Sequence, residues 1–141
     1  MSLIEVAMVV GIIALLATLS IPAFNGFRAD TKLSHEAQVI AGLVRLAQQR
    51  AVAEQINHTL NINTQTRNVQ VVNNLSGAVI TSHTIDAAIT IQSVTGLTDN
   101  QVVFNPTGSA SISGVITIRN EQNKLTDIEI KPSGYVDITS L

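Results

Sequence analysis

The stretch at residues 3–24 is almost entirely apolar, and it constrains the fold more than any other feature of the sequence. It is about 22 residues long, which suffices for one helix to cross the hydrocarbon core of a membrane. The rest of the chain is an ordinary soluble mixture, rich in Asn, Thr and Ser. The sequence therefore predicts one apolar N-terminal helix that carries one domain with a polar surface.

This apolar stretch differs from both a signal peptide and a plain membrane anchor. A signal peptide begins with basic residues, whereas the first basic residue here is Arg28. A plain anchor would exclude Glu5, because a carboxylate at membrane depth costs roughly 2.5–3.5 kcal/mol. Two interpretations of Glu5 stay open. Either it lies hydrated at the interface, or it neutralises an α-amino group at residue 1, which between neighbouring subunits would set the register of a helical assembly.

The motif MSLIEV at residues 1–6, followed by the apolar run and Pro22, resembles the mature N-terminus of type IV pilins and type II secretion pseudopilins. The resemblance covers about residues 1–28. It implies that a prepilin peptidase removes a short basic leader, that Met1 is then methylated, and that Glu5 guides assembly. Met1 and Ser2 stand where this family most often has Phe and Thr. If Met1 is instead an initiator residue, methylation does not follow, but the argument for Glu5 is unaffected.

Two positions are expected to shape the helix. Pro22 removes an amide donor and crowds the preceding turn, which predicts a kink or local unwinding near residues 17–22. Gly11 is a small residue that permits flexibility or a close approach between helices.

From residue 25 to about residue 54, the pattern becomes amphipathic. Apolar residues recur at steps of four and three, at Leu33, Ala37, Ile40, Val44, Ala47 and Ala51. This spacing places them on one face of a helix. We expect that face to pack on the chain's own sheet.

After residue 55 the period of the apolar residues changes to two, which is typical of strands. The expected strands are 56–62, 69–71, 78–82, 84–92, 101–104, 115–120, 125–131 and 135–139. Short strands with closely spaced turn residues predict an antiparallel sheet or a small sandwich. The expected fold class is α+β and pilin-like. Residues 1–24 form the transmembrane or filament-core half of the helix, 25–54 its amphipathic half, and 55–141 a β-rich globular domain.

The C-terminal region resembles the domain of minor pilins and H-type pseudopilins. The resemblance rests on FNPTG at residues 104–108, a strand at 115–119, a polar turn at 120–124 and IEIKPSGYV at 128–136. Many pilins hold this region with a pair of cysteines, but this chain has none. Strand pairing is therefore expected to hold it.

The sequence contains no recognisable catalytic motif, and we expect neither an enzyme nor a bound cofactor or metal. The histidines, His35, His58 and His83, lack metal-ligand spacing, and no nucleophile motif, phosphate loop or dinucleotide fingerprint is present. With a net charge of −2 and eight scattered basic residues, nucleic-acid binding is not expected either.

These patterns indicate a structural subunit that polymerises through its N-terminal helix into a type IV pilus or pilus-like filament. The alternative is a minor pilin or pseudopilin of a type II secretion or DNA-uptake (competence) system. The resemblance implies several partners: further copies of the chain, minor pilins, a platform protein, an assembly ATPase and a prepilin peptidase. It also implies a single-pass location in the inner membrane before assembly, and afterwards an extracellular pilus or periplasmic pseudopilus.

Overall fold

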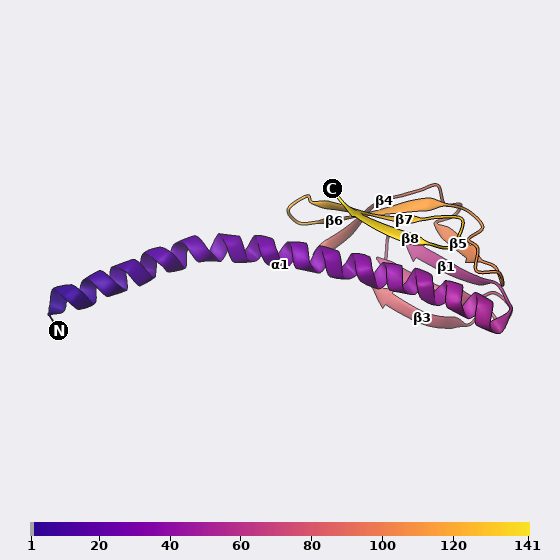
Figure 1. The fold of residues 1–141 in the computed structure, drawn as a ribbon, viewed down its shortest axis with the longest axis horizontal. Coiled ribbons are helices and arrows are strands. Elements are labelled where there is room, and N and C mark those ends of the chain that lie inside the picture. The colour runs from indigo at the N-terminus through magenta and orange to yellow at the C-terminus, as the bar shows by residue number, and fades with distance from the viewer. Residues whose placement is uncertain (1) are drawn as a thin grey trace.

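The computed structural model describes residues 2–141, except for the side chains of residues 19–25. A single long helix, α1 (Leu3–Glu54), is followed by eight strands in the described chain. Figure 1 shows that the first half of α1 projects from the domain, while the second half lies along it.

Helix α1 begins at a capping box. Ser2 is extended (φ −84°, ψ 153°), its Oγ accepts a hydrogen bond from the Glu5 amide at 3.4 Å, and Glu5 Oε2 accepts one from the Ser2 amide at 2.9 Å. The helix ends where Gln55 adopts a left-handed conformation with φ 56°. The helix is assigned continuously between these ends, and the side chain of Pro22 lies outside the described residues. The expected kink therefore stays a prediction.

The strands form two antiparallel sheets of four strands each. The first sheet has the order β3-β2-β1-β5 and comprises β1 (His58–Asn63), β2 (Asn68–Asn73), β3 (Val79–Thr84) and β5 (Gln101–Phe104). The second has the order β4-β6-β7-β8 and comprises β4 (Ile89–Thr95), β6 (Gly114–Asn120), β7 (Leu125–Ile130) and β8 (Val136–Ser140). The α+β class predicted from the sequence is confirmed.

One expected strand, at residues 84–92, is wrong. The chain leaves the first sheet after Thr84 and enters the second at Ile89. Between them it turns, with the Ile89 amide bonded to the Asp86 carbonyl at 2.9 Å. Ile85 and Ile89 are both buried, at 2% and 0% exposed. The apolar pattern continues without a break because both side chains enter the same core while the backbone crosses between sheets.

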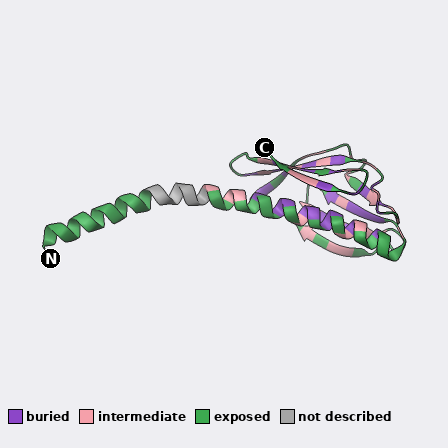
Figure 2. Ribbon diagram, viewed as in Figure 1, coloured by how far each residue is buried: buried purple, intermediate pink, exposed green. Residues whose placement is uncertain are grey.

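The core lies between the second half of α1 and the two sheets. The helical stripe predicted from the sequence is at most 1% exposed, which confirms that it packs inside the domain. Among the helical residues whose burial is described, Figure 2 shows the buried ones where α1 lies along the domain. Three members of the stripe, Ala37, Ala47 and Ala51, are small, so the helix backbone can approach the strands closely.

Candidate assembly helix and its anchors to the domain

The projecting half of α1 exposes its large apolar side chains. Leu3, Ile4 and Met8 are 90%, 77% and 71% exposed, and residues 2–18 are all classed as exposed. Monomeric soluble proteins rarely expose apolar patches of this size, and such patches mark interfaces with proteins or membranes. This half of α1 is therefore a candidate docking surface.

Over the described residues, no helical stretch combines the length and the apolar character that a membrane span requires. The span expected at residues 3–24 includes residues 19–25, whose side chains lie outside the described part of the chain.

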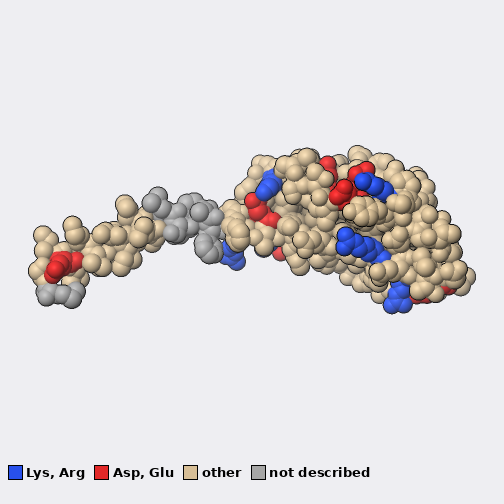
Figure 3. Space-filling model, viewed as in Figure 1, with Lys and Arg blue, Asp and Glu red and all other residues tan. Residues whose placement is uncertain are grey.

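Glu5 is the only acidic residue before Asp30. Figure 3 shows an acidic group near the free end of the projecting half of the helix. In the isolated chain this carboxylate caps its own helix through the Ser2 amide, where the helix dipole also favours a negative charge. The spacing Ser2-x-x-Glu5 before an apolar run is the sequence signature of such a cap, so this signal for the start of the helix is present in the sequence itself.

Two other positions singled out in the sequence are Met1 and Gly11. Met1, the expected site of processing and methylation, lies outside the described residues, so its pairing with Glu5 stays a prediction. A Cβ added at Gly11 would meet nothing within 4 Å, so this position is open to a neighbouring helix.

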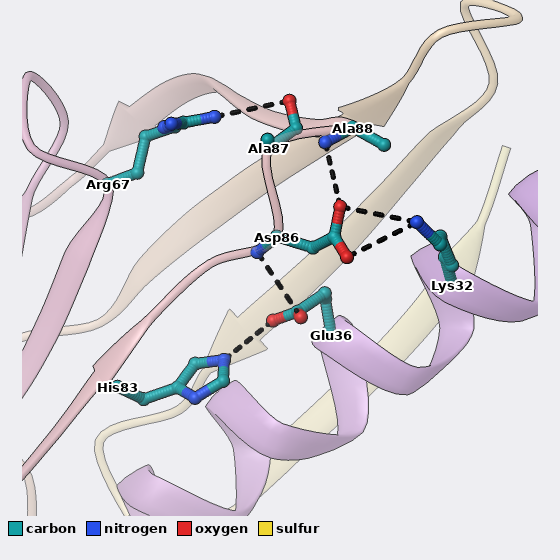
Figure 4. Close-up of polar contacts among 7 residues, drawn as sticks. All are labelled: Lys32, Glu36, Arg67, His83, Asp86, Ala87 and Ala88. Atoms are coloured by element: carbon teal, nitrogen blue, oxygen red, sulfur yellow. Dashed lines mark hydrogen bonds and ion pairs between the residues drawn. The ribbon is translucent and has the colours of Figure 1, made fainter.

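A first set of polar contacts joins α1 to the segment between β3 and β4 (Figure 4). The Glu36 side chain is only 6% exposed and lies 2.8 Å from His83 Nε2. One turn earlier, Lys32 Nζ lies 3.3 Å from the Asp86 carboxylate. The Ala88 amide, which donates to Asp86 Oδ1 at 2.8 Å, and then Lys32 hold the pKa of Asp86 below its ordinary value. These contacts fix the crossing between the two sheets against the helix.

A second set joins α1 to the turn between β6 and β7. Asn120 is 3% exposed, and its Oδ1 accepts hydrogen bonds from the amides of Gln122 and Lys124 at 3.1 and 2.9 Å. Its Nδ2 donates to Asp30 Oδ1 at 3.2 Å, while Lys124 Nζ lies 3.0 Å from Asp30 Oδ2. The Asp30 carboxylate on the helix therefore binds both the buried side chain of Asn120 and the exposed side chain of Lys124.

A third contact joins α1 to the two C-terminal loops. Gln48 Nε2 donates to the carbonyl oxygens of Gly108 at 2.8 Å and Ser133 at 3.3 Å. The two loops also bond each other, through the Ala110 amide and the Pro132 carbonyl at 2.9 Å. We expected strand pairing alone to hold this region in the absence of cysteines. The structure adds the Gln48 side chain, whose contacts with residues 60 and 85 positions away no local pattern predicts.

His58 and His83 each have neighbours of their own. His83 binds Glu36, and His58 is fully buried with Nδ1 3.2 Å from the Ile56 carbonyl. His58 Nε2 lies 3.3 Å from Glu54 Oε2, although the pair lacks hydrogen-bond geometry. No group of three or more potential ligands occurs within the part of the chain that the structure describes.

The anchors make the second half of α1 and both sheets one unit, from which an apolar helix with a single carboxylate projects. This arrangement defines a pilin-like class of fold. Residues 36–134 match the sequence profile of the family described as type II transport protein GspH. Because this match covers more than half of the chain, the chain belongs to that family. No curated protein sequence matches the chain.

Solved structures agree with this assignment. EpsH, a minor pseudopilin from the type 2 secretion system of Vibrio cholerae, is 11% identical, with a TM-score of 0.65 over 77% of this chain and 97% of EpsH. FimU, a type IV minor pilin of Pseudomonas aeruginosa, is 13% identical, with a TM-score of 0.64 over 80% of this chain and 92% of FimU. The similarity confirms the fold and the resemblance to pilins and pseudopilins. The family match begins at residue 36, so it does not include Glu5.

Proposed function

We propose that the chain is a minor, non-enzymatic subunit of a type II secretion pseudopilus or a type IV pilus-like filament, which it joins through the projecting half of α1. The observation that carries the proposal is the exposed apolar surface of residues 3–18. Membership of the GspH family, together with the fold of EpsH and FimU, supports the minor-subunit alternative over a major pilin.

Before assembly, the apolar half of α1 resides in the inner membrane with the domain outside. On assembly it leaves lipid for a bundle of similar helices. Lipid tails are as apolar as the helix surface, so this exchange has little hydrophobic driving force. Assembly therefore needs a polar contact that guides it and partners that supply work, namely an assembly ATPase and a platform protein. Related pilins form the bundle, and a prepilin peptidase acts earlier.

Glu5 supplies the guidance through a change of hydrogen-bond partner. In the single chain its carboxylate binds the Ser2 amide. In the filament it turns to the α-amino group of a neighbouring subunit, which fixes the axial position of one helix against the next. Since an unpaired charge in an apolar bundle costs about 3–5 kcal/mol, subunits in the wrong register are rejected.

Two substitutions separate this role from helix capping. Glu5→Gln keeps a side chain that can complete the capping box but removes the charge, whereas Glu5→Ala removes both. We expect both variants to enter sheared filaments about a hundredfold less than wild type, measured by quantitative immunoblotting in cells that contain the rest of the assembly system. Asp99→Asn, at an exposed turn of the domain, is the matched control.

If Glu5→Gln enters filaments as well as wild type, the carboxylate acts only as a cap and the guidance mechanism is wrong. If wild type is absent from filaments, the chain is not a subunit. Mass spectrometry of the N-terminal peptide from assembled subunits tests separately whether Met1 is methylated.

A further inference from the structure

A cavity of about 310 Å³ lies where α1 leaves the domain. Its walls come from the helix, from the start of β4 and from the turn between β6 and β7. Ala29 and Ala88, which are partly exposed, supply apolar surface, and Arg28, Lys32 and Glu121 supply the charges. Because three separate elements build it, the cavity is a feature of the assembled fold rather than of one loop.

The charged side chains of this cavity differ in whether they have a partner within the described part of the chain. Lys32 is paired with Asp86 at 3.3 Å. Neither the Arg28 guanidinium nor the Glu121 carboxylate has an ion pair or hydrogen bond with any residue that the structure describes. The cavity therefore presents one free cation and one free anion beside an apolar wall.

The position of the cavity along α1 matches the surface of a membrane. At 1.5 Å per residue, the helix from Leu3 to Arg28 is about 38 Å long. A bilayer has a hydrocarbon core of about 30 Å and measures about 40–45 Å with its headgroups. With the capped end of α1 at one surface, Arg28 lies in the headgroup layer of the other.

We propose that this cavity binds the phosphoethanolamine headgroup of a membrane phospholipid, an inference that rests on the membrane residence proposed above. The Arg28 guanidinium donates to the phosphate, for which its planar fork of N–H groups is suited. The Glu121 carboxylate accepts from the ammonium group, and Ala29 and Ala88 contact the adjoining carbon atoms.

The pairing of opposite free charges selects this headgroup over others. Phosphatidylglycerol has the same phosphate but no ammonium group, so the Glu121 carboxylate would stay without a cation. Phosphatidylcholine carries a quaternary ammonium, which has no N–H to donate to the carboxylate. The bound lipid sets the depth of the subunit in the membrane, and it must be released when the subunit enters the filament.

The test uses the full chain in nanodiscs that contain equal amounts of phosphatidylethanolamine, phosphatidylcholine and phosphatidylglycerol, with retained lipids counted by native mass spectrometry. Wild type should retain phosphatidylethanolamine about fivefold over each of the other two. Arg28→Gln should lower the retention of all three. Glu121→Gln should abolish only the preference for the ethanolamine lipid.

Arg45→Gln and Asp99→Asn, both at exposed positions outside the cavity, should behave as wild type. Equal retention of the three lipids by wild type, a preference for phosphatidylglycerol, or an unchanged profile in Arg28→Gln would each overturn the headgroup site. Failure of the chain to insert into nanodiscs would instead refute the membrane residence on which the site depends.

Discussion

Replacing Gly134 by alanine should destabilise the domain by breaking the contact between α1 and the C-terminal loops. Gly134 has φ +79°, a conformation that side chains rarely adopt, and a Cβ there would overlap Gln48 Nε2 and the Gly108 carbonyl oxygen. The side chain of Gln48 would have to leave, and its hydrogen bonds to Gly108 and Ser133 would be lost.

The magnitude follows from these two effects. A left-handed conformation costs a non-glycine residue about 1–2 kcal/mol. Each lost hydrogen bond contributes about 1 kcal/mol. Gly134→Ala should therefore lower the free energy of unfolding by about 3–4 kcal/mol, measured by urea denaturation of the full chain in detergent and followed by circular dichroism.

Gly77→Ala is the matched control, because Gly77 also has a left-handed conformation (φ +70°) but a Cβ there would meet nothing within 4 Å. It should cost only the conformational part, about 1–2 kcal/mol. If the two variants lose equal stability, the Gln48 contact does not hold the loops and the reasoning fails.

Two further predictions concern α1 and its first anchor. Asp86 has a lowered pKa, so its stabilising contribution is present above its ordinary pKa of 3.8 and is lost as the pH falls through the lower folded value. On acidification below pH 3.8, the free energy of unfolding of Asp86→Asn should accordingly fall less than that of wild type. If urea denaturation at a series of pH values shows the same fall for both proteins, the prediction is wrong. Gly42 lies on an exposed face of the helix, and a Cβ added there would meet nothing within 4 Å. Gly42→Ala should therefore raise the free energy of unfolding by about 0.5–1 kcal/mol, seen as a higher urea midpoint. A lower midpoint would show that the position is more constrained than the structure indicates.

Much of the fold followed from local periodicity. The stripe from Leu33 to Ala51 was predicted from its spacing and is buried, because that spacing keeps side chains on one face of any α-helix. Most strands followed from alternation between apolar and polar residues. The exception was the crossing at residues 85–88, where the apolar pattern continues although the pairing partner changes.

Some residues of the candidate site could be predicted from the sequence, and others could not. Glu5 stood out in the sequence because a charge inside an apolar run is costly wherever the chain folds. The second member of its capping box, Ser2, was also readable from spacing alone. The anchors at Glu36, Asn120 and Gln48 were not, because each joins residues between 47 and 94 positions apart in the chain.

The sequence by itself determined that this protein has a long helix with an apolar half, an amphipathic half and a β-rich domain, since hydrophobic period and segment length are local properties. Only the tertiary structure decided that the strands divide into two sheets and that Gln48 joins the two C-terminal loops. It alone placed the free charges of Arg28 and Glu121 around one cavity. These features depend on which distant segments meet, and that choice is made by the packing of the whole core rather than by any one stretch of the chain.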